Sequence, residues 1–379
     1  MSERPILEDR LSRRQNWPMT VINAEAMLPT PEPRYLIDAE GRRGGSSEVM
    51  PSEDILLELY RQMVVGRRFD SQATALTKQG RLAVYPSARG QEACQIGAVA
   101  AMAERDWLFP TYRDSMAMVS RGINPVEVLT LLRGDWHCGY DPYLHRTATQ
   151  CTPLATNTLH AVGLAHAARL AGEDTVALVM LGDGATSEGD THEALNIAAV
   201  WQAPVVFLLQ NNGYAISVPL AKQTRARHLA DRGIGYGLPG VLIDGNDAAI
   251  VHTAVTEAIE RARSGGGPTL IEAVTYRIEA HTNADDASRY RDASEVAEWL
   301  TRDPVDRLRT YLTDNGVLDD AGSAAIASEA EDKAARLRAA MNADVSTDPA
   351  ELFAHVYTEP TPALQRQAAA LADEIALES

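Results

Sequence analysis

Residues 175–217 read TVALVMLGDGATSEGDTHEALNIAAVWQAPVVFLLQNNGYAIS, and this stretch decides the fold. Residues 175–181 and 204–210 are short apolar runs, partly β-branched, and each is predicted to be a buried strand. Between them, apolar residues recur at helical spacing up to Trp201, after an acidic first turn that Ser187 precedes. Strand, helix and strand in so short a stretch indicate a βαβ unit, whose two strands are parallel and whose crossover is right-handed.

Polar residues follow both predicted strands. Asp183 comes just after the first strand and Asn212 just after the second, so the parallel arrangement brings both to one edge of the sheet, where open α/β sheets bind ligands. Carboxylate, amide and carbonyl oxygens suit Mg²⁺ better than zinc. Gly182 and Gly184 would let the backbone approach a ligand, and helix N–H groups beyond them offer an anion site. The edge therefore has the outline of a diphosphate–magnesium site.

The spacing of these motifs carries a family resemblance. GDG, followed after about 30 residues by NN, resembles the thiamine diphosphate motif. The longer run LGDGATSEGD…NNGYAISVP resembles the alpha chain of heterotetrameric 2-oxo acid dehydrogenases, the decarboxylating first component of the multienzyme complexes. A nucleotide-binding Rossmann turn is the alternative, but GDGATSEG lacks the glycine spacing of G-x-G-x-x-G. The resemblance, over roughly residues 50–360, implies a thiamine-diphosphate-binding α/β fold with a mostly parallel sheet flanked by helices.

The composition limits the partners and the compartment. With 35 basic and 52 acidic side chains the net charge is −17, which argues against nucleic acid or an anionic membrane surface as a partner. No apolar run reaches the roughly 18 residues of a membrane span, and MSERPILEDRLSRRQ has no secretory h-region. Three cysteines, Cys94, Cys138 and Cys151, form no C-x-x-C pair, which fits a reducing cytoplasm.

Three regions are expected along the chain. Residues 1–50, with several prolines and the run GRRGGSS, are interpreted as an extended arm with one small hairpin around residues 35–42. Residues 51–293 are expected to form the cofactor-binding α/β domain. Residues 294–379 show apolar residues at helical spacing among mixed charges and are expected to form a helical region with a tail. That tail could dock on a partner chain or pack on its own body.

Further cofactor contacts are assigned by the resemblance. In DWLFPTYRDS, an arginine just past a predicted strand is placed to hold a phosphate, although by itself it would be a surface salt bridge. The family's F-x-x-YR motif gives the diphosphate role to Tyr112 and Arg113. In the PLAT stretch, Leu154 matches the leucine that packs under the cofactor, and Pro153 precedes it. The resemblance further assigns cofactor binding to residues at the GDG and NN motifs, with Mg²⁺ held by the last three: Gly182, Gly184, Ala185, Asp183, Asn212 and the carbonyl of Tyr214.

His281 ends a long alternating strand that is predicted over residues 268–281. The resemblance makes it the catalytic residue of this chain, in contact with the cofactor phosphate and the reacting centre. In the loop that follows, the residues matching the family's ordering network are Asp285, Tyr290 and Arg291. Asp292 stands where animal members place a regulatory serine, so kinase control through that position is not expected.

Two further questions concern a potassium site and the role of a glutamate. The family's structural potassium site is doubtful here, because Cys151 and Asn157 replace the usual serine and glutamine, and a thiol is a poor potassium ligand. Glu92, near the start of a predicted helix, is interpreted as a first-turn partner of the helix dipole rather than as a catalytic group.

The implied reaction is the oxidative decarboxylation of a 2-oxo acid with transfer of the acyl group to a lipoyl group of an acyltransferase core. In the family a beta subunit completes an α2β2 heterotetramer and supplies the glutamate that activates the cofactor, so this chain should be inactive alone. NNGYAIS and DGND favour a branched-chain substrate of the 2-oxoisovalerate type over pyruvate, which is the alternative. An NAD-linked Rossmann reductase and a non-catalytic scaffold are the other classes. The intact pair Asp183 and Asn212 argues against the scaffold.

Overall fold

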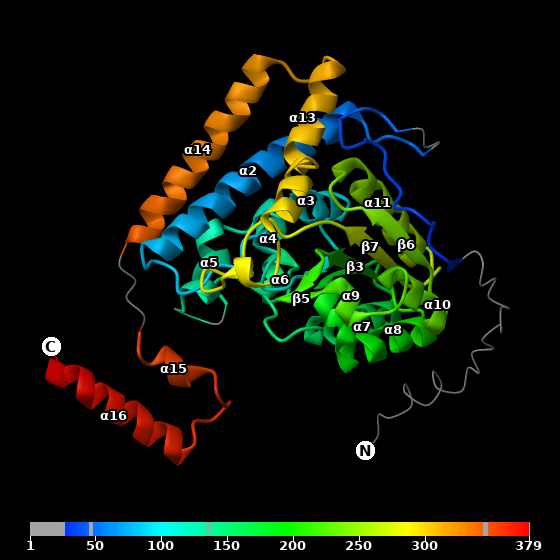
Figure 1. Ribbon diagram of the computed structural model, residues 1–379. Helices are drawn as coiled ribbons and strands as arrows, with labels where there is room; N and C mark the ends of the chain where they lie inside the picture. The colour runs from blue at the N-terminus through cyan, green and yellow to red at the C-terminus, as the bar shows by residue number, and fades with distance from the viewer. Residues whose placement is uncertain (1–26, 45–47, 135, 137, 344–347, 379) are drawn as a thin grey trace, which may run out of the picture.

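A parallel sheet forms the centre of the computed structural model, which describes residues 27–44, 48–134, 136, 138–343 and 348–378. The strand order is β1-β2-β3-β7-β6, and every neighbouring pair is parallel (Figure 1). The strands are β1 Trp107–Phe109, β2 Ala177–Gly182, β3 Val205–Asn211, β6 Gly240–Asp244 and β7 Thr269–Val274. A small antiparallel ribbon is formed by β4 Tyr214–Ala215 and β5 Val218–Pro219.

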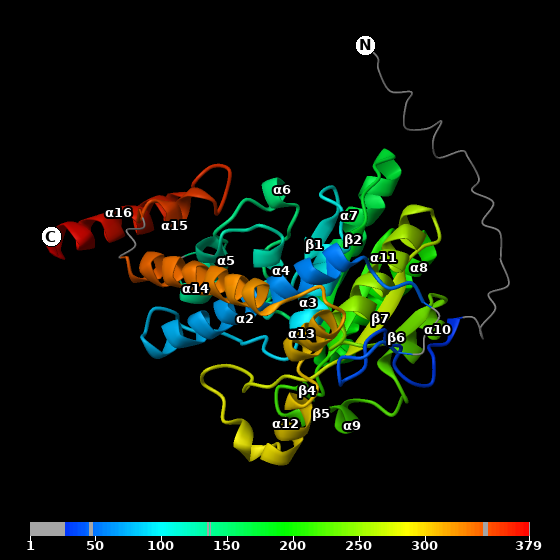
Figure 2. The ribbon, with the colours of Figure 1, turned by 90° about the horizontal axis from the view of Figure 1, so that it is seen from above.

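Helices cover both faces of the sheet (Figures 1 and 2). One apolar cluster joins the sheet to α7 Thr156–Ala171 and α8 Gly189–Trp201. The other cluster joins the sheet to α2 Glu53–Lys78, α3 Glu92–Ala100, α4 Ser115–Ser120, α5 Pro125–Arg133, α11 Ala248–Arg263, α13 Pro304–Asp314 and α14 Asp320–Asn342. The shorter elements are α6 Pro142–His145, η2 Asp183–Ser187, α9 Leu220–Gln223, η3 Leu229–Asp231, α10 Arg232–Tyr236, η4 Ala287–Arg289, α12 Ala293–Leu300 and α15 Glu351–Ala354. The predicted fold class, a mostly parallel sheet flanked by helices, is confirmed.

The predicted strand–helix–strand unit is β2, α8 and β3. Residues of β2 alternate between the two apolar clusters, with Leu178 in one and Val179 in the other, so both sides of the strand are buried. This double burial explains why the strand reads as a continuous apolar run. One detail differs from the sequence prediction, because the 3₁₀ turn η2 separates β2 from α8 and Glu188, not Ser187, occupies the N-cap position.

The predicted long strand over residues 268–281 is wrong in its extent. β7 ends at Val274, because its neighbours β3 and β6 end at Asn211 and Asp244 and offer no further ladder. The chain then pairs with the segment before α3, where the Thr275 hydroxyl donates to Gly90 O (2.8 Å) and Ile278 N to Arg89 O (3.1 Å). His281 is therefore carried by a loop beyond the sheet.

The described part of the N-terminal arm lies on the β6 edge of the sheet. Arg34 bonds Leu242 and Asp244 through its backbone, and a turn at Gly41 closes a small hairpin in which Ile37 pairs with Arg43. The buried carboxylate of Asp247 accepts the N–H groups of Leu36 and Ile37, at 2.6 and 2.8 Å. The arm from residue 34 to 44 is thus held by its own chain.

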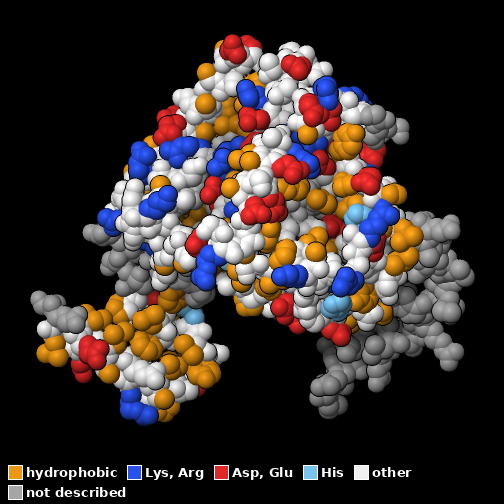
Figure 3. All heavy atoms as spheres, in the orientation of Figure 1, with side chains coloured by type: hydrophobic (Ala, Val, Ile, Leu, Met, Phe, Trp, Pro, Cys, Tyr) orange, Lys and Arg blue, Asp and Glu red, His pale blue; other side chains and the backbone are white. Residues whose placement is uncertain are grey.

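The C-terminal region is helical, as predicted. Figures 1 and 2 show α14 alongside α2, while α16 (Pro362–Glu378) stands apart from the body. No described side chain of α16 is buried, and hydrophobic side chains gather on this segment (Figure 3). Among the described residues, none of the helices combines the length and the apolar character that a membrane span requires.

Candidate functional site

A cavity of about 390 Å³ opens beyond the carboxyl ends of β1, β2 and β3, close to the segment that follows β7. The predicted site residues that line it are Tyr112, Arg113, Leu154, Gly182, Asp183, Gly184, Ala185, Asn212, Tyr214 and His281. Pro153 is not among the lining residues. Sequence positions that are more than 160 residues apart, such as Arg113 and His281, meet here because all the parallel strands deliver their following loops to one edge.

Asp183 and Asn212 lie side by side at one end of the cavity. The Asp183 carboxylate is 1% exposed and accepts hydrogen bonds from the backbone N–H of Asn212 and from Gln223 Nε2, at 2.6 Å for the latter. Burial raises the pKa of Asp183 despite these bonds. Among the described residues no basic side chain forms an ion pair with it. The negative charge therefore has room for a cation as its partner.

The two glycines of GDG serve different purposes. A side chain on Gly182 would meet no atom within 4 Å, so this residue leaves open space beside the cavity. A Cβ on Gly184 would lie 2.8 Å from Cβ of Ala215, so Gly184 allows η2 to pack closely on β4. Both glycines line the cavity, so the predicted role of bringing the backbone close to a ligand stays a prediction for each of them.

Two arginines bring positive charge to the cavity wall. Arg113 is 5% exposed; its Nη1 donates to Ser87 O at 2.7 Å and its Nη2 to His281 O at 3.1 Å. Arg277 is also buried, and its Nη2 donates to Ile216 O at 2.7 Å. Neither guanidinium forms an ion pair with an acidic side chain of the described residues. Two unneutralised guanidinium groups on a cavity wall form a site for a multiply charged anion.

Arg277 was not predicted from the sequence. It stands three residues beyond the last residue of β7, and the predicted strand over residues 268–281 concealed this position on the ligand edge. Three amides that also line the cavity, Gln91, Gln210 and Gln223, were not predicted either. No motif in the sequence singles them out.

His281 is oriented by both arginines. Its Nδ1 lies 3.0 Å from Arg113 Nη2 and 3.2 Å from Arg277 Nη1. An arginine can only donate, so Nδ1 accepts and the proton of the neutral ring resides on Nε2. Burial, followed by the charges of Arg113 and Arg277, lowers the pKa of His281 to about 4. At pH 7 the ring is therefore neutral and has one N–H to offer.

The loop that carries His281 is held by the residues predicted to order it. The Asp285 carboxylate accepts the His281 N–H at 2.8 Å and the Tyr290 hydroxyl at 2.5 Å. That hydroxyl in turn accepts from Arg277 Nη2 at 3.0 Å, and Arg291 donates to the carbonyls of residues 277 and 278. These bonds couple the position of the histidine to that of Arg277.

Leu154 and Cys151 lie on the loop before α7, and Asn157 lies in the first turn of that helix. Leu154 lines the cavity with 39% of its surface exposed, which leaves an apolar surface for a ligand's ring. Asn157 is buried and donates through Nδ2 to Phe109 O and Met180 O, at 3.2 and 2.8 Å. Cys151 Sγ donates to Pro153 O at 3.1 Å. Asn157 thus ties the start of α7 to β1 and β2.

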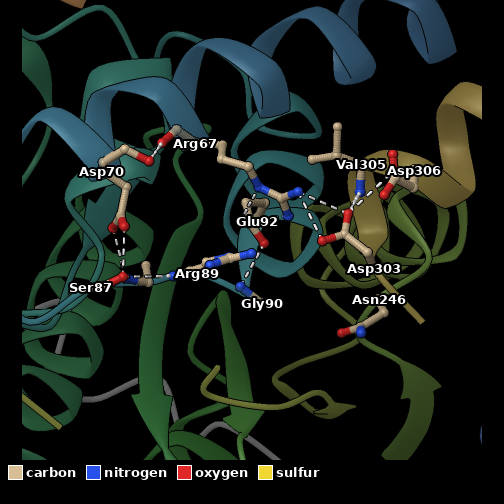
Figure 4. Close-up of polar contacts among 12 residues, drawn as sticks. Arg67, Asp70, Ser87, Arg89, Gly90, Glu92, Asn246, Asp303, Val305 and Asp306 are labelled. Carbon is tan, nitrogen blue, oxygen red and sulfur yellow. Dashed lines mark hydrogen bonds and ion pairs between the residues drawn. The ribbon is translucent and has the colours of Figure 1, made fainter. Parts of the chain in front are cut away.

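Glu92 lies in the core. It is 0% exposed and accepts from Arg67 Nε and from the Gly90 N–H, both at 2.8 Å, while Arg67 also pairs with Asp303 at 2.8 Å (Figure 4). Burial raises the pKa of Glu92, and the charge of Arg67 opposes this rise. Because Glu92 does not line the cavity, its structural interpretation stands, although the partner is a buried arginine rather than the helix dipole alone.

Replacing Glu92 by alanine is expected to lower the free energy of unfolding by about 2 to 3 kcal/mol, because the Gly90 N–H would lose its buried acceptor and the partly buried Arg67 would keep only Asp303 as a partner. Urea unfolding followed by circular dichroism measures this change. Glu279→Ala is the control: it breaks the half-exposed pair with Arg89 and should cost about 1 kcal/mol or less. Equal costs for the two variants would contradict the buried ion pair at Glu92.

Comparison with known proteins agrees with this geometry. Residues 60–344 match the family model described as "Dehydrogenase E1 component". The chain belongs to this family. It is 48% identical to the 3-methyl-2-oxobutanoate dehydrogenase subunit alpha of Mycobacterium tuberculosis (strain ATCC 25618 / H37Rv), over 86% of this chain and 88% of the relative. The expected family is thereby confirmed.

Two further relatives are named, one for 2-oxoisovalerate, which is another name for 3-methyl-2-oxobutanoate, and one for pyruvate. The 2-oxoisovalerate dehydrogenase subunit alpha of Bacillus subtilis (strain 168) is 39% identical over 70% of this chain and 83% of its own length. The pyruvate dehydrogenase E1 component subunit alpha of Staphylococcus aureus (strain Mu50 / ATCC 700699) is 39% identical, over 71% of this chain and 73% of its own length. Membership makes this chain part of a 2-oxo acid dehydrogenase and implies dependence on thiamine diphosphate.

Proposed function

We propose that this chain is the alpha subunit of a branched-chain 2-oxo acid dehydrogenase. With a beta subunit, in an α2β2 assembly, it decarboxylates an acid of the 2-oxoisovalerate type and passes the acyl group to a lipoyl group of an acyltransferase core. The observation that carries the proposal is that Asp183, Asn212, Arg113, Arg277 and His281 all line the same cavity. The 48% identical mycobacterial relative supports the branched-chain substrate. Pyruvate is the second candidate, since a pyruvate dehydrogenase subunit is 39% identical.

The donor set at Asp183 fits Mg²⁺. Asp183 is a buried carboxylate that forms no ion pair with a basic side chain of the described residues, although the charge of Arg277 acts on it, and Asn212 adds an amide oxygen beside it. Tyr214 lies opposite Pro219 in the β4–β5 ribbon, and Pro219 has no N–H to donate to the Tyr214 carbonyl. Gln223, which bonds Asp183, has a buried Oε1 without a partner in the described residues. Hard oxygen atoms in this number, completed by phosphate oxygens, suit Mg²⁺.

Bound thiamine diphosphate supplies a carbon nucleophile and an electron sink for decarboxylation. Arg113 and Arg277 would bind the diphosphate and offset its charge, as two unpaired guanidinium groups can. Leu154 would pack under the rings with its exposed apolar surface. His281 would donate Nε2–H toward the reacting centre, held in place by the two arginines at Nδ1.

The partner follows from the carboxylates of the cavity. Asp183 and Glu188 are the two that line it, and both belong to the segment that follows β2. The glutamate that activates the cofactor would come from the beta subunit. We also propose a cytoplasmic location, which the three free cysteines support.

Purified alone, the chain is expected to turn over no 2-oxo acid, because in the family the activating glutamate belongs to the beta subunit. Co-expression with a beta subunit should yield a complex that decarboxylates 2-oxoisovalerate faster than pyruvate, measured with an artificial electron acceptor. A complex containing Glu188→Gln is the matched control and should remain active. Turnover by the isolated chain would refute the shared site, and faster turnover of pyruvate would favour the second candidate.

A further inference from the structure

A continuous chain of buried amides links Asp114 to Asn212. Gln210 Nε2 donates to Asp114 Oδ1 at 2.7 Å, and Gln91 Nε2 donates to Gln210 Oε1 at 2.9 Å. Asn212 Nδ2 donates to Gln91 Oε1 at 3.1 Å. All four side chains are at most 6% exposed, so bulk water cannot replace these bonds. Each glutamine is thus bound at both ends, by a neighbouring amide or by the carboxylate.

The carboxylate fixes the direction of every bond in this chain. Asp114 Oδ2 already accepts the N–H and the hydroxyl of Thr111, both at 2.7 Å, so Asp114 is surrounded by donors. Gln210 must therefore turn its NH₂ to Asp114 and its oxygen to Gln91. Gln91 must then donate its NH₂ to the Gln210 oxygen, which leaves its own oxygen to accept from the NH₂ of Asn212. The Oδ1 of Asn212 is left on the side of the Tyr214 N–H, at 3.3 Å.

This direction matters because the two ends of an asparagine amide differ chemically. The amide oxygen is a hard ligand for Mg²⁺, whereas the NH₂ group is not a ligand and would repel the cation. An isolated asparagine can exchange the two ends by a rotation of its amide. Within the chain, that rotation would bring two oxygens, or two NH₂ groups, face to face in a buried place.

We propose that Asp114, acting through Gln210 and Gln91, is a positioning residue that keeps the Asn212 oxygen directed to the metal. The inference rests on the proposed function, because it presupposes that Asn212 is a ligand of Mg²⁺. It assigns a role to Asp114, which does not line the cavity, and to the two glutamines that connect it to Asn212. Their effect on the site is one of orientation, as for groups that orient metal ligands from outside the coordination sphere.

Asp114→Asn is the sharpest test, since it changes one atom at the far end of the chain. The fixed backbone N–H of Thr111 would hold the new amide oxygen, and the new NH₂ would face Gln210. Gln210 and Gln91 would then reverse, and Asn212 would present NH₂ to the metal. In the complex with the beta subunit and saturating thiamine diphosphate, the dissociation constant of Mn²⁺, measured by electron paramagnetic resonance, is expected to rise about tenfold or more.

Gln91→Leu breaks the chain beside Asn212 and should weaken Mn²⁺ binding to a similar degree. Gln95→Leu is the matched control, because Gln95 is a fully buried glutamine one turn later on α3 that bonds Arg113 O and the Ala117 N–H instead. It should destabilise the fold comparably and leave Mn²⁺ binding within about twofold. Unchanged affinity in Asp114→Asn, or equal loss in Gln95→Leu, would overturn the positioning role. Failure of the wild-type complex to bind Mn²⁺ would overturn the metal site itself.

Discussion

Replacing Asp183 by alanine is expected to abolish magnesium-dependent binding of thiamine diphosphate. Asp183 is the buried carboxylate of the proposed metal site, and the Asn212 and Tyr214 oxygens carry no negative charge to replace it. Loss of the charged ligand should lower the affinity for the metal by about 100-fold or more, since even groups that only orient a ligand contribute about 10- to 100-fold to that affinity. Isothermal titration of thiamine diphosphate into the α–β complex, with and without Mg²⁺, measures the loss.

Glu193→Ala is a suitable control for the change in charge. Glu193 is exposed on α8 and does not line the cavity, so its removal should leave cofactor affinity within about twofold. The Asp183 variant should also fold. Burial raises the pKa of Asp183, which means that keeping its carboxylate ionised costs folding free energy, and alanine removes this cost. Unchanged cofactor affinity in Asp183→Ala would remove the metal from this position.

The sequence predicted the part of the site that depends on local pattern. β2 and β3 are apolar runs with both faces buried, and each ends where polar residues begin, so the pattern of apolar and polar residues is enough to place Asp183 and Asn212 together. Because the two strands are parallel, their carboxyl ends and the residues that follow them lie at the same edge of the sheet. The same reasoning placed Arg113 just beyond β1.

The parts that could not be predicted depend on contacts between distant segments. The end of β7 is set by where β3 and β6 end, so the apolar pattern of residues 268–281 alone overestimated the strand. Gln91 and Gln210 look like ordinary polar residues in the sequence, and their role arises only when α3 lies against the end of β3. Asp247 likewise binds the backbone of residues 36 and 37, about 210 positions earlier.

Replacing His281 by alanine is expected to lower kcat by about 10²- to 10⁴-fold, the range typical of a group that handles a proton or a hydrogen bond in the transition state. The low pKa of the ring, about 4, means that it works as a neutral donor through Nε2 at pH 7. His281→Gln, which restores an N–H donor, should therefore recover part of the activity. Steady-state kinetics of the α–β complex with 2-oxoisovalerate measures both effects.

A proton-transfer role would give a different result. If His281 had to accept and return a proton, the glutamine variant would be as slow as the alanine variant, because an amide does not titrate. Folding is checked with His252→Ala, a half-buried histidine on α11 that does not line the cavity and should keep full activity. Because Arg113 and Arg277 donate to Nδ1, only Nε2 is available to the substrate. Wild-type rates in His281→Ala would contradict the catalytic role and leave His281 with the structural role of binding the two arginines.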